Sequence, residues 1–398
     1  MPAPRTVYDA VLQAARDVTK LGCALDAEML GTALLGSVYT VASEDRAAAV
    51  RDFVGRFLTA TTDPDTPATA TIREVFATLV PDADGAAEVG HATEAPLWAT
   101  QLGRVRPTGC WAYGDVYGDQ TSYLVTYAYE DSSDGGPEHA VVALVDHNIG
   151  ITKDVFVATS AAPLLDQVRE ICDADELTWF RSEDPGRLRD EVGRHLRVTD
   201  ELSDLPSDGS LSTDRALAAA RLALLPAVNT PPLTEPAGPT GQDLVRDFLA
   251  SPEATRFDLT GGGAADVASM DFCLSLVLDH AATLPGGDPL RWSPAVAGLF
   301  LLDWVHRRAV LDLDDAAMMP RVVRAWSAYS TGRRNLPAAA VRETEDALEE
   351  LIPEFARLYT TGERRSPATA AVAQLISEGV DPNDSAAIDA WLEANRDE

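Results

Sequence analysis

The strand pattern between residues 111 and 154 constrains the fold most, because the rest of the chain repeats apolar residues at helical spacing. In residues 123–129, Tyr and Val alternate with Leu, Thr and Ala, and this period of two is typical of a strand. Residues 140–145 are apolar at every position, which predicts a central strand buried on both faces. We expect two more strands, near residues 110–116 and 151–158, and two covering helices, near residues 161–171 and 185–196. The expected sheet is small and either antiparallel or mixed.

The length of 398 residues exceeds what one ordinary hydrophobic core serves and predicts two or three domains. Helices over residues 1–100, together with the sheet and its covering helices over 105–200, are expected to form an α+β domain spanning residues 1–200. Residues 201–240 are polar and rich in proline, and they predict a semi-rigid linker with one short helix. Residues 241–398 have a helical pattern and predict an all-helical domain. The expected fold class is therefore α+β and mostly helical.

Four helix starts carry a recognisable capping pattern. Ser43 is followed by two acidic residues, which predicts an N-cap with an acidic first turn. Thr66, Ser293 and Ser366 are each followed directly by proline, and this pair is typical of an N-cap and the first helical position. We therefore expect helices to begin at these four places.

The charge of the chain excludes one class of partner. The formal net charge is −31, and only two of the 32 basic residues are lysine. A surface this acidic repels a phosphate backbone, so we expect no nucleic-acid binding. The arginine-rich, acidic composition suggests a GC-rich genome, with a salt-adapted organism as the second explanation. Mimicry of DNA toward a basic protein is a further, weaker alternative.

The sequence also bears on location. No apolar run reaches the roughly 18–20 residues that a membrane-spanning helix needs. The N-terminal residues contain no apolar signal-peptide core, so we expect a cytoplasmic protein and no membrane partner. The four cysteines are far apart and form no CxxC pair, which argues against a zinc knuckle or a disulfide framework.

Two Tyr-Gly-Asp triplets, at residues 113–115 and 117–119, place Asp115 and Asp119 four residues apart. Paired carboxylates could bind a divalent cation or act as general acid and base. In a strand, this spacing would put both side chains on one face. The alternative is that each Gly supplies a bulge or a turn and each Asp caps its own turn. We favour the turn, because it requires no ligand.

The polar residues 146–150, Asp-His-Asn-Ile-Gly, follow the most apolar strand, where a sheet holds side chains rigidly. His147 could be a general base oriented by Asp119 or Asp154. Lys153 could neutralise an anionic ligand, although a surface pair with Asp154 is the interpretation that we favour. The candidate catalytic residues are Asp119, Asp146, His147 and Lys153.

His147 could instead be one ligand of a metal site, together with Asp115, Asp119 or His139. The structural alternative is that Asp146, His147 and Asn148 form a strand-ending turn, in which asparagine tolerates left-handed geometry. No known metal-ligand spacing is fulfilled, and we favour the turn.

Established catalytic motifs are missing from the sequence. It contains no serine hydrolase, kinase, Rossmann, P-loop, zincin or EF-hand pattern, and we expect no cofactor. The function that we expect is that of a non-catalytic interaction or regulatory protein with a protein partner. The alternative is an enzyme, or a protein that binds a small molecule or a metal at the ends of the N-terminal strands.

Several phrases resemble one group of proteins. Residues 288–336 contain a WSP helix start, an LLDW helix and the phrase PRVVRAW. The ending EGVDPNDSAAIDAWLE and the strand phrases VYGDQ and VDHNIGITKD accompany them. Together they resemble a family of uncharacterised actinobacterial proteins, over roughly half of the chain. The resemblance implies no activity, because none is known for the group, and it agrees with a GC-rich genome.

Overall fold

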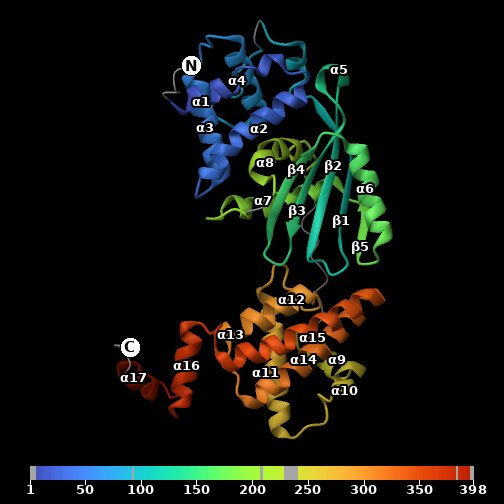
Figure 1. Ribbon diagram of the computed structural model, residues 1–398, viewed down its shortest axis with the longest axis vertical. Helices are drawn as coiled ribbons and strands as arrows, with labels where there is room; N and C mark the ends of the chain where they lie inside the picture. Colours follow the sequence, from blue (N-terminus) through green and yellow to red (C-terminus); the bar gives the residue numbers. More distant parts are fainter. Residues whose placement is uncertain (1–5, 92–93, 207–208, 228–240, 382–383, 395–398) are drawn as a thin grey trace. The chain divides into compact units, whose positions relative to one another are not determined.

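The computed structural model describes residues 6–91, 94–206, 209–227, 241–381 and 384–394 (Figure 1). The chain divides into two compact units. Unit 1 comprises Met1–Asp115 and Gln120–Pro232, and unit 2 comprises Val116–Asp119 and Leu233–Glu398. The expected α+β, mostly helical class is confirmed, since the strands of the described residues form a single sheet among many helices.

The sheet belongs to unit 1 and has the strand order β4-β3-β2-β1-β5, with antiparallel pairing throughout. Its strands are β1 (Val105–Asp115), β2 (Gln120–Tyr129), β3 (His139–Asp146), β4 (Ile151–Ala158) and β5 (Thr178–Ser182). The first four match the strands expected from the sequence. Strand β5 was not expected, because its five residues show no clear apolar alternation.

Both faces of β3 are buried, as the unbroken apolar run predicts. Val141 and Ala143 join the large core formed with the N-terminal helices, whereas Ala140 and Val142 pack with Leu165 in a smaller core on the other face. Alternate side chains of a strand point to opposite faces, so two layers of helices are needed to cover this one strand. The strand lies between β4 and β2, while β2 occupies the middle of the sheet.

The helices of unit 1 follow their local capping signals. They are α1 (Val7–Ala14), α2 (Ala24–Val41), α3 (Arg46–Ala60), α4 (Pro67–Leu79), α5 (Ser132–Gly135), α6 (Ala161–Ala174), α7 (Pro185–Asp200) and α8 (Leu211–Leu222), with short 3₁₀ turns at Val18–Lys20 and Leu97–Gln101. Thr66 is the N-cap of α4, as predicted. The predicted cap at Ser43 is wrong: Asp45 adopts a left-handed conformation, and its side chain accepts the Ala48 amide hydrogen.

Helix α8 lies within the range 201–240, where the sequence predicts a linker with one short helix. It packs against α2 and β4, and it buries Leu217 and Arg221 in the core of unit 1. The close approach of α8 to α2 depends on Gly36 of α2, because a Cβ there would lie 2.5 Å from the Ser212 carbonyl oxygen. The proline-rich remainder of the predicted linker, residues 228–240, lies outside the described residues.

A buried ion pair between Glu28 of α2 and Arg221 of α8 crosses the core of unit 1. The Tyr129 hydroxyl donates to Glu28 over 2.5 Å, and the Gly103 amide donates to the other carboxylate oxygen over 2.7 Å. Arg221 also donates to Nε2 of His139 over 3.1 Å. The network therefore connects two helices with two neighbouring strands through the buried side chains of Glu28, Arg221, Tyr129 and His139.

Unit 2 is built from helices around an aromatic core. The helices are α9 (Gly241–Leu249), α10 (Pro252–Arg256), α11 (Ala264–Thr283), α12 (Pro294–Leu299), α13 (Val305–Arg308), α14 (Leu313–Arg333), α15 (Ala338–Thr361), α16 (Pro367–Ser377) and α17 (Ser385–Ala394), and a π-helical turn spans Phe300–Trp304. Ser293 and Ser366 cap α12 and α16, as predicted. Phe248, Trp292 and Trp326 are buried in the core. In the part of the chain that the structure describes, no helix combines the length and apolar composition needed to cross a bilayer.

Candidate metal centre

The turn between β3 and β4 positions His147. Asp146 ends β3, and its side chain accepts the Asn148 amide hydrogen over 3.0 Å, while its carbonyl accepts that of Gly150 over 2.9 Å. Gly150 has a φ of 73°, a left-handed conformation that glycine adopts readily. The strand-ending turn favoured from the sequence is therefore present, but Gly150 takes the left-handed position that we expected of Asn148. Nε2 of His147 lies 3.0 Å from the hydroxyl oxygen of Thr121 on β2.

Helix α7 supplies two further polar side chains, Glu191 and His195. It begins at Pro185 after the N-cap Asp184, whose side chain accepts the Arg187 amide hydrogen over 2.9 Å. Residues four apart lie on the same face of a helix, so Glu191 and His195 are neighbours.

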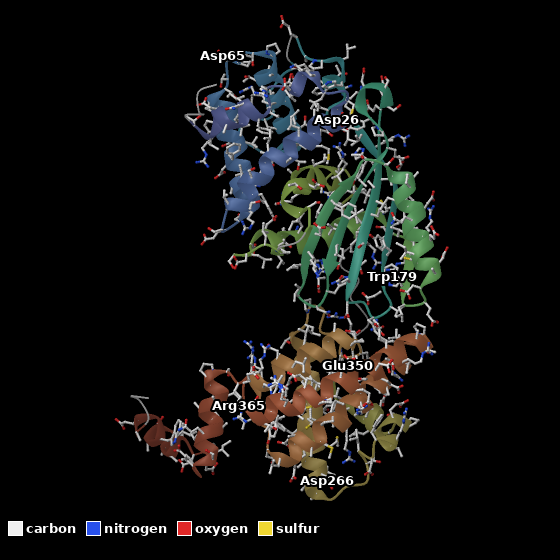
Figure 2. The ribbon with its side chains drawn as sticks, viewed as in Figure 1. Asp26, Asp65, Trp179, Asp266, Glu350 and Arg365 are labelled. Carbon is white, nitrogen blue, oxygen red and sulfur yellow. The ribbon has the colours of Figure 1, made fainter. Side chains whose placement is uncertain are left out.

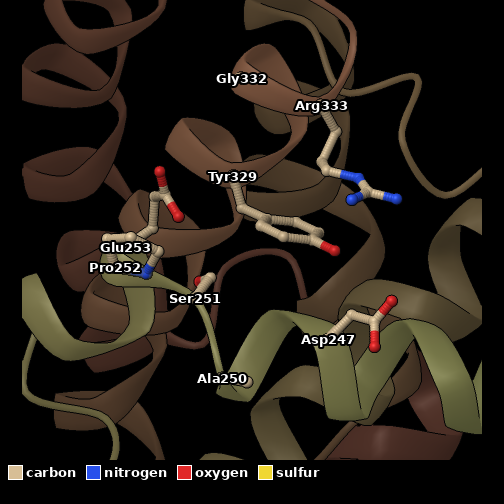
Figure 3. A pocket seen from close by; sticks show the side chains of 8 residues that line it. All are labelled: Asp247, Ala250, Ser251, Pro252, Glu253, Tyr329, Gly332 and Arg333. Atoms are coloured by element: carbon tan, nitrogen blue, oxygen red, sulfur yellow. The ribbon is translucent and has the colours of Figure 1, made fainter.

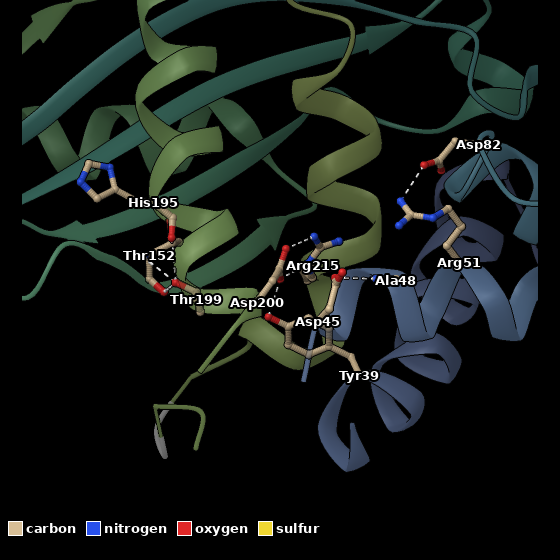
Figure 4. Close-up of polar contacts among 10 residues, drawn as sticks. All are labelled: Tyr39, Asp45, Ala48, Arg51, Asp82, Thr152, His195, Thr199, Asp200 and Arg215. Atoms are coloured by element: carbon tan, nitrogen blue, oxygen red, sulfur yellow. Dashed lines mark hydrogen bonds and ion pairs between the residues drawn. The ribbon is translucent and has the colours of Figure 1, made fainter. Parts of the chain in front are cut away.

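The end of α7 is attached firmly to the rest of unit 1 (Figure 4). The Thr199 hydroxyl accepts the amide hydrogen of Thr152 on β4 over 2.9 Å and lies 2.9 Å from the carbonyl oxygen of the same residue. Asp200 accepts hydrogen bonds from Tyr39 over 2.8 Å and from Nε of Arg215 over 2.7 Å. These contacts hold the helix against the sheet and so determine where His195 lies.

His147, Glu191 and His195 come together as one cluster, in which one possible ligand atom from each residue lies within 4.8 Å of the others. The two imidazole rings meet edge to face, with their centroids 5.6 Å apart. His195 is buried, whereas His147 and Glu191 are partly exposed. The cluster is therefore shielded on the His195 side and reachable from the other two.

Each member of the cluster has an orienting neighbour. Nδ1 of His195 lies 2.9 Å from the Glu191 carbonyl oxygen, to which it can donate, and this contact orients the ring. Arg194 lies 2.6 Å from one carboxylate oxygen of Glu191, and Nδ1 of His195 lies 3.6 Å from the other. The Thr121 hydroxyl holds the His147 ring. Second contacts of this kind fix the orientation of metal-binding histidines in known sites.

Two imidazoles and one carboxylate are a suitable ligand set for a divalent transition metal such as Zn²⁺. In a tetrahedral site with metal–ligand distances of about 2.0–2.1 Å, the ligand atoms lie about 3.3 Å from one another. The three atoms that lie within 4.8 Å of one another would close by at most about 1.5 Å to reach this spacing, which rotation about the side-chain torsions can supply. Three protein ligands would leave a coordination position for water or another ligand.

The two aspartates of the Tyr-Gly-Asp triplets do not share a strand. Strand β1 ends at Asp115, and residues 116–119 form a turn, as we favoured, so the alternative of two carboxylates on one strand face is wrong. Asp115 accepts the Gln120 amide hydrogen over 2.7 Å, and its carbonyl accepts the indole hydrogen of Trp179 over 2.8 Å. Trp179 belongs to β5 and is labelled in Figure 2. Asp119 belongs to unit 2, where it lies 3.7 Å from Arg291. Asp115 thus caps its own turn.

The other candidate catalytic residues take separate positions in unit 1. Asp146 accepts a hydrogen bond from the Gln120 side chain over 3.2 Å. Lys153 is exposed on β4. Asp154 accepts the Ser210 amide hydrogen over 2.8 Å before α8. A catalytic role for these residues stays a prediction, as does the orientation of His147 by Asp119 or Asp154.

His139 lies in the core of unit 1, where Arg221 donates to its Nε2 and its Nδ1 lies 3.3 Å from the Pro137 carbonyl oxygen. Burial lowers the pKa of His139 to about 4, and the nearby Arg221 adds to the effect. Both ring nitrogens are therefore already engaged in hydrogen bonds. A metal at His139 would have to displace Arg221 from one of them.

Of the candidates chosen from the sequence, His147 alone belongs to the His–Glu–His cluster. Glu191 and His195 were missed, because the pair EVGRH on an amphipathic helix resembles ordinary intrahelical pairing. The signal that could have found them is the four-residue spacing of a carboxylate and a histidine on a helix predicted to cover the strand that His147 follows.

Comparison of the chain with protein-family models, with curated proteins and with solved structures gave no match. The resemblance to the actinobacterial group therefore stays a prediction, and the functional argument depends on the geometry of the site.

Proposed function

We propose that the chain binds a divalent first-row transition metal ion through His147, Glu191 and His195. The observation that carries this proposal is that three potential ligand atoms lie within 4.8 Å of one another. They come from a turn and a helix, and His147 and Glu191 are 44 positions apart in the sequence. The metal would link the β3–β4 turn to α7. The interaction or regulatory role expected from the sequence stays a prediction, and it is compatible with metal binding.

The alternative explanation is that Glu191 and His195 form an intrahelical pair and that His147 only packs against them. Two features favour a metal site. The Glu191 carbonyl and the Thr121 hydroxyl each contact one ring nitrogen, which directs the two imidazoles. Arg194 contacts one oxygen of Glu191 and holds the carboxylate in place, and carboxylates are ordinarily ionised in the pH range where histidine is neutral and able to bind metal.

The test is titration of the metal-free protein with Co²⁺, followed by its visible ligand-field absorption, and with Zn²⁺ by calorimetry. We expect one ion per chain and no comparable binding of Mg²⁺, which prefers oxygen ligands. His147→Gln, Glu191→Gln and His195→Gln should each weaken binding by more than about 100-fold, since loss even of outer contacts costs about 10–100-fold.

His91→Gln is the matched control, because His91 also lies beside a carboxylate, 3.1 Å from Glu74, but does not belong to the cluster. Circular dichroism of each variant without metal checks that it is folded. Equal affinities for the wild type and for His147→Gln and Glu191→Gln would reject the proposal, and so would an equal loss in the His91→Gln control.

A further inference from the structure

A pocket of about 400 Å³ lies in unit 2, between the short helices α9 and α10 and the end of α14. Asp247 of α9, Glu253 of α10, and Tyr329, Gly332 and Arg333 of α14 line it. The volume falls in the lower part of the range of roughly 300–1,000 Å³ that small-molecule sites occupy. All of these residues belong to unit 2, so the pocket is formed within one compact body.

The ring of Tyr329 is rigidly placed in this pocket. It packs against Phe248 and Trp326, with ring centroids 5.3 and 5.7 Å apart, and it is only 5% exposed. Within the described residues, its hydroxyl has no hydrogen-bond partner. A buried hydroxyl without a partner costs about 1–3 kcal/mol of desolvation, so the fold retains an unfavourable group at the wall of a cavity.

Gly332, which also lines the pocket, is a second residue that lowers the stability of unit 2. A glycine inside a helix is less favourable than alanine by about 1 kcal/mol. Gly332 has no left-handed φ to require it, and a Cβ would meet no atom within 4 Å. Neither backbone conformation nor packing in unit 2 therefore explains the glycine, whereas a side chain at this position would occupy the pocket.

One guanidinium and two carboxylates lie around the ring (Figure 3). The Glu253 carboxylate lies on one side of Tyr329, and the Arg333 guanidinium lies on the other, with the Asp247 carboxylate below the hydroxyl. The centre of the guanidinium is 5.9 Å from the ring centroid. Burial raises the pKa of Tyr329, so its hydroxyl stays protonated at neutral pH and is able to donate.

We propose that this pocket binds a small zwitterion of the amino-acid class. Arg333 and the Tyr329 hydroxyl would bind the carboxylate, because both are donors on the same side of the ring. Asp247, which lies below the same hydroxyl, would accept from the ammonium group, and Glu253 adds a second negative charge on the other side of the ring. A ligand that carries only a cation would meet Arg333, and one that carries only an anion would meet two carboxylates. A zwitterion satisfies all three charges and gives the Tyr329 hydroxyl a partner.

The test is a thermal-shift screen of the full chain with each common L-amino acid, followed by calorimetry on those that raise the melting temperature. We expect at least one to bind, and we expect its methyl ester and its N-acetyl derivative to bind much more weakly, since each lacks one charge. Arg333→Gln should weaken binding by about 10–100-fold, and Tyr329→Phe by about 3–10-fold. Gly332→Leu should abolish binding.

Tyr329→Phe also separates a ligand contact from a structural role. It should leave the ligand-free protein as stable as the wild type or more so, because it removes a buried hydroxyl without a partner, while it weakens binding. Arg308→Gln, at an exposed arginine of the same unit that does not line the pocket, is the control and should bind like the wild type. The proposal fails if no amino acid binds, or if Gly332→Leu binds as well as the wild type.

Discussion

Replacement of Arg221 by methionine should severely destabilise unit 1, because it leaves the Glu28 carboxylate buried without a positive partner. Glu28 is 0% and Arg221 1% exposed, so water cannot replace the lost contact. Arg221 donates to the Tyr129 hydroxyl over 2.9 Å and to His139 over 3.1 Å in addition to its contact with Glu28. These interactions disappear together in the variant.

The magnitude follows from the burial. Removal of one partner of a buried ion pair costs about 3–5 kcal/mol. For folded units of about 150–250 residues, each kcal/mol lowers the melting temperature by roughly 2–4 °C, which corresponds to a decrease of about 6–20 °C. Glu28→Gln should be similarly costly, because it leaves the Arg221 cation unpaired. In the double variant neither charge remains, and the amide oxygen introduced by Glu28→Gln can still accept from Tyr129 or Gly103.

The assay is a double-mutant cycle by urea unfolding and calorimetry. We expect the double variant to be more stable than the sum of the single effects by more than about 2 kcal/mol. Arg51→Met is the control, since Arg51 lies 3.0 Å from Asp82 in an exposed ion pair of the same unit (Figure 4). Its cost should be about 0–1 kcal/mol. Additive single effects, or an Arg221→Met cost as small as that of Arg51→Met, would refute the reasoning.

Three further predictions concern pH, packing and metal affinity. Burial lowers the pKa of His280 from 6.5 to about 4, so the unfolded chain takes up the proton first and unit 2 loses stability as the pH falls through this window. Each tenfold change in proton affinity corresponds to about 1.4 kcal/mol, so His280→Phe should remove roughly 3 kcal/mol of the stability that unit 2 loses between neutral pH and pH ~4. Urea unfolding of both proteins at the two pH values measures this, and an unchanged pH dependence in the variant would contradict the prediction. Gly36→Ala should lower the free energy of unfolding by about 1–3 kcal/mol, because the new Cβ would meet the Ser212 backbone. Gly332→Ala, where the Cβ meets no atom, should raise it by up to about 1 kcal/mol. Calorimetry of both variants tests this, and equal effects would refute the packing argument. Thr121→Val should weaken Zn²⁺ binding by about 10–100-fold in calorimetry, and an unchanged affinity would argue against His147 as a ligand.

The sequence predicts local features of this chain well. The positions of β3 and β4 follow from apolar runs whose ends are marked by polar turns, whereas the sequence left open whether the sheet is antiparallel or mixed. The starts of α4 and α12 follow from Thr66 and Ser293, because a cap depends only on a side chain and the amide groups a few residues away. At Ser43 the same reasoning failed, since a left-handed conformation at Asp45 allows its own side chain to cap α3.

The candidate site was predictable only in part. His147 attracts attention because it follows a buried strand, and neighbours along the chain suggest Asp146 and Lys153 as companions. In the structure its companions are Glu191 and His195, which the packing of α7 on the sheet brings to it. Asp119, four residues from Asp115 in the sequence, belongs to the other compact unit.

The sequence by itself determined the class of fold, four of the five strands of the sheet and three of the four predicted helix starts, because apolar period and capping are properties of a few consecutive residues. The tertiary structure decided which distant groups meet. Glu28 and Arg221 are 193 positions apart, and their pairing depends on α2 and α8 approaching closely across Gly36. The His147 cluster likewise depends on α7 being held to β4 through Thr152 and Thr199. Such contacts arise from the packing of whole elements, and no spacing along the chain encodes them.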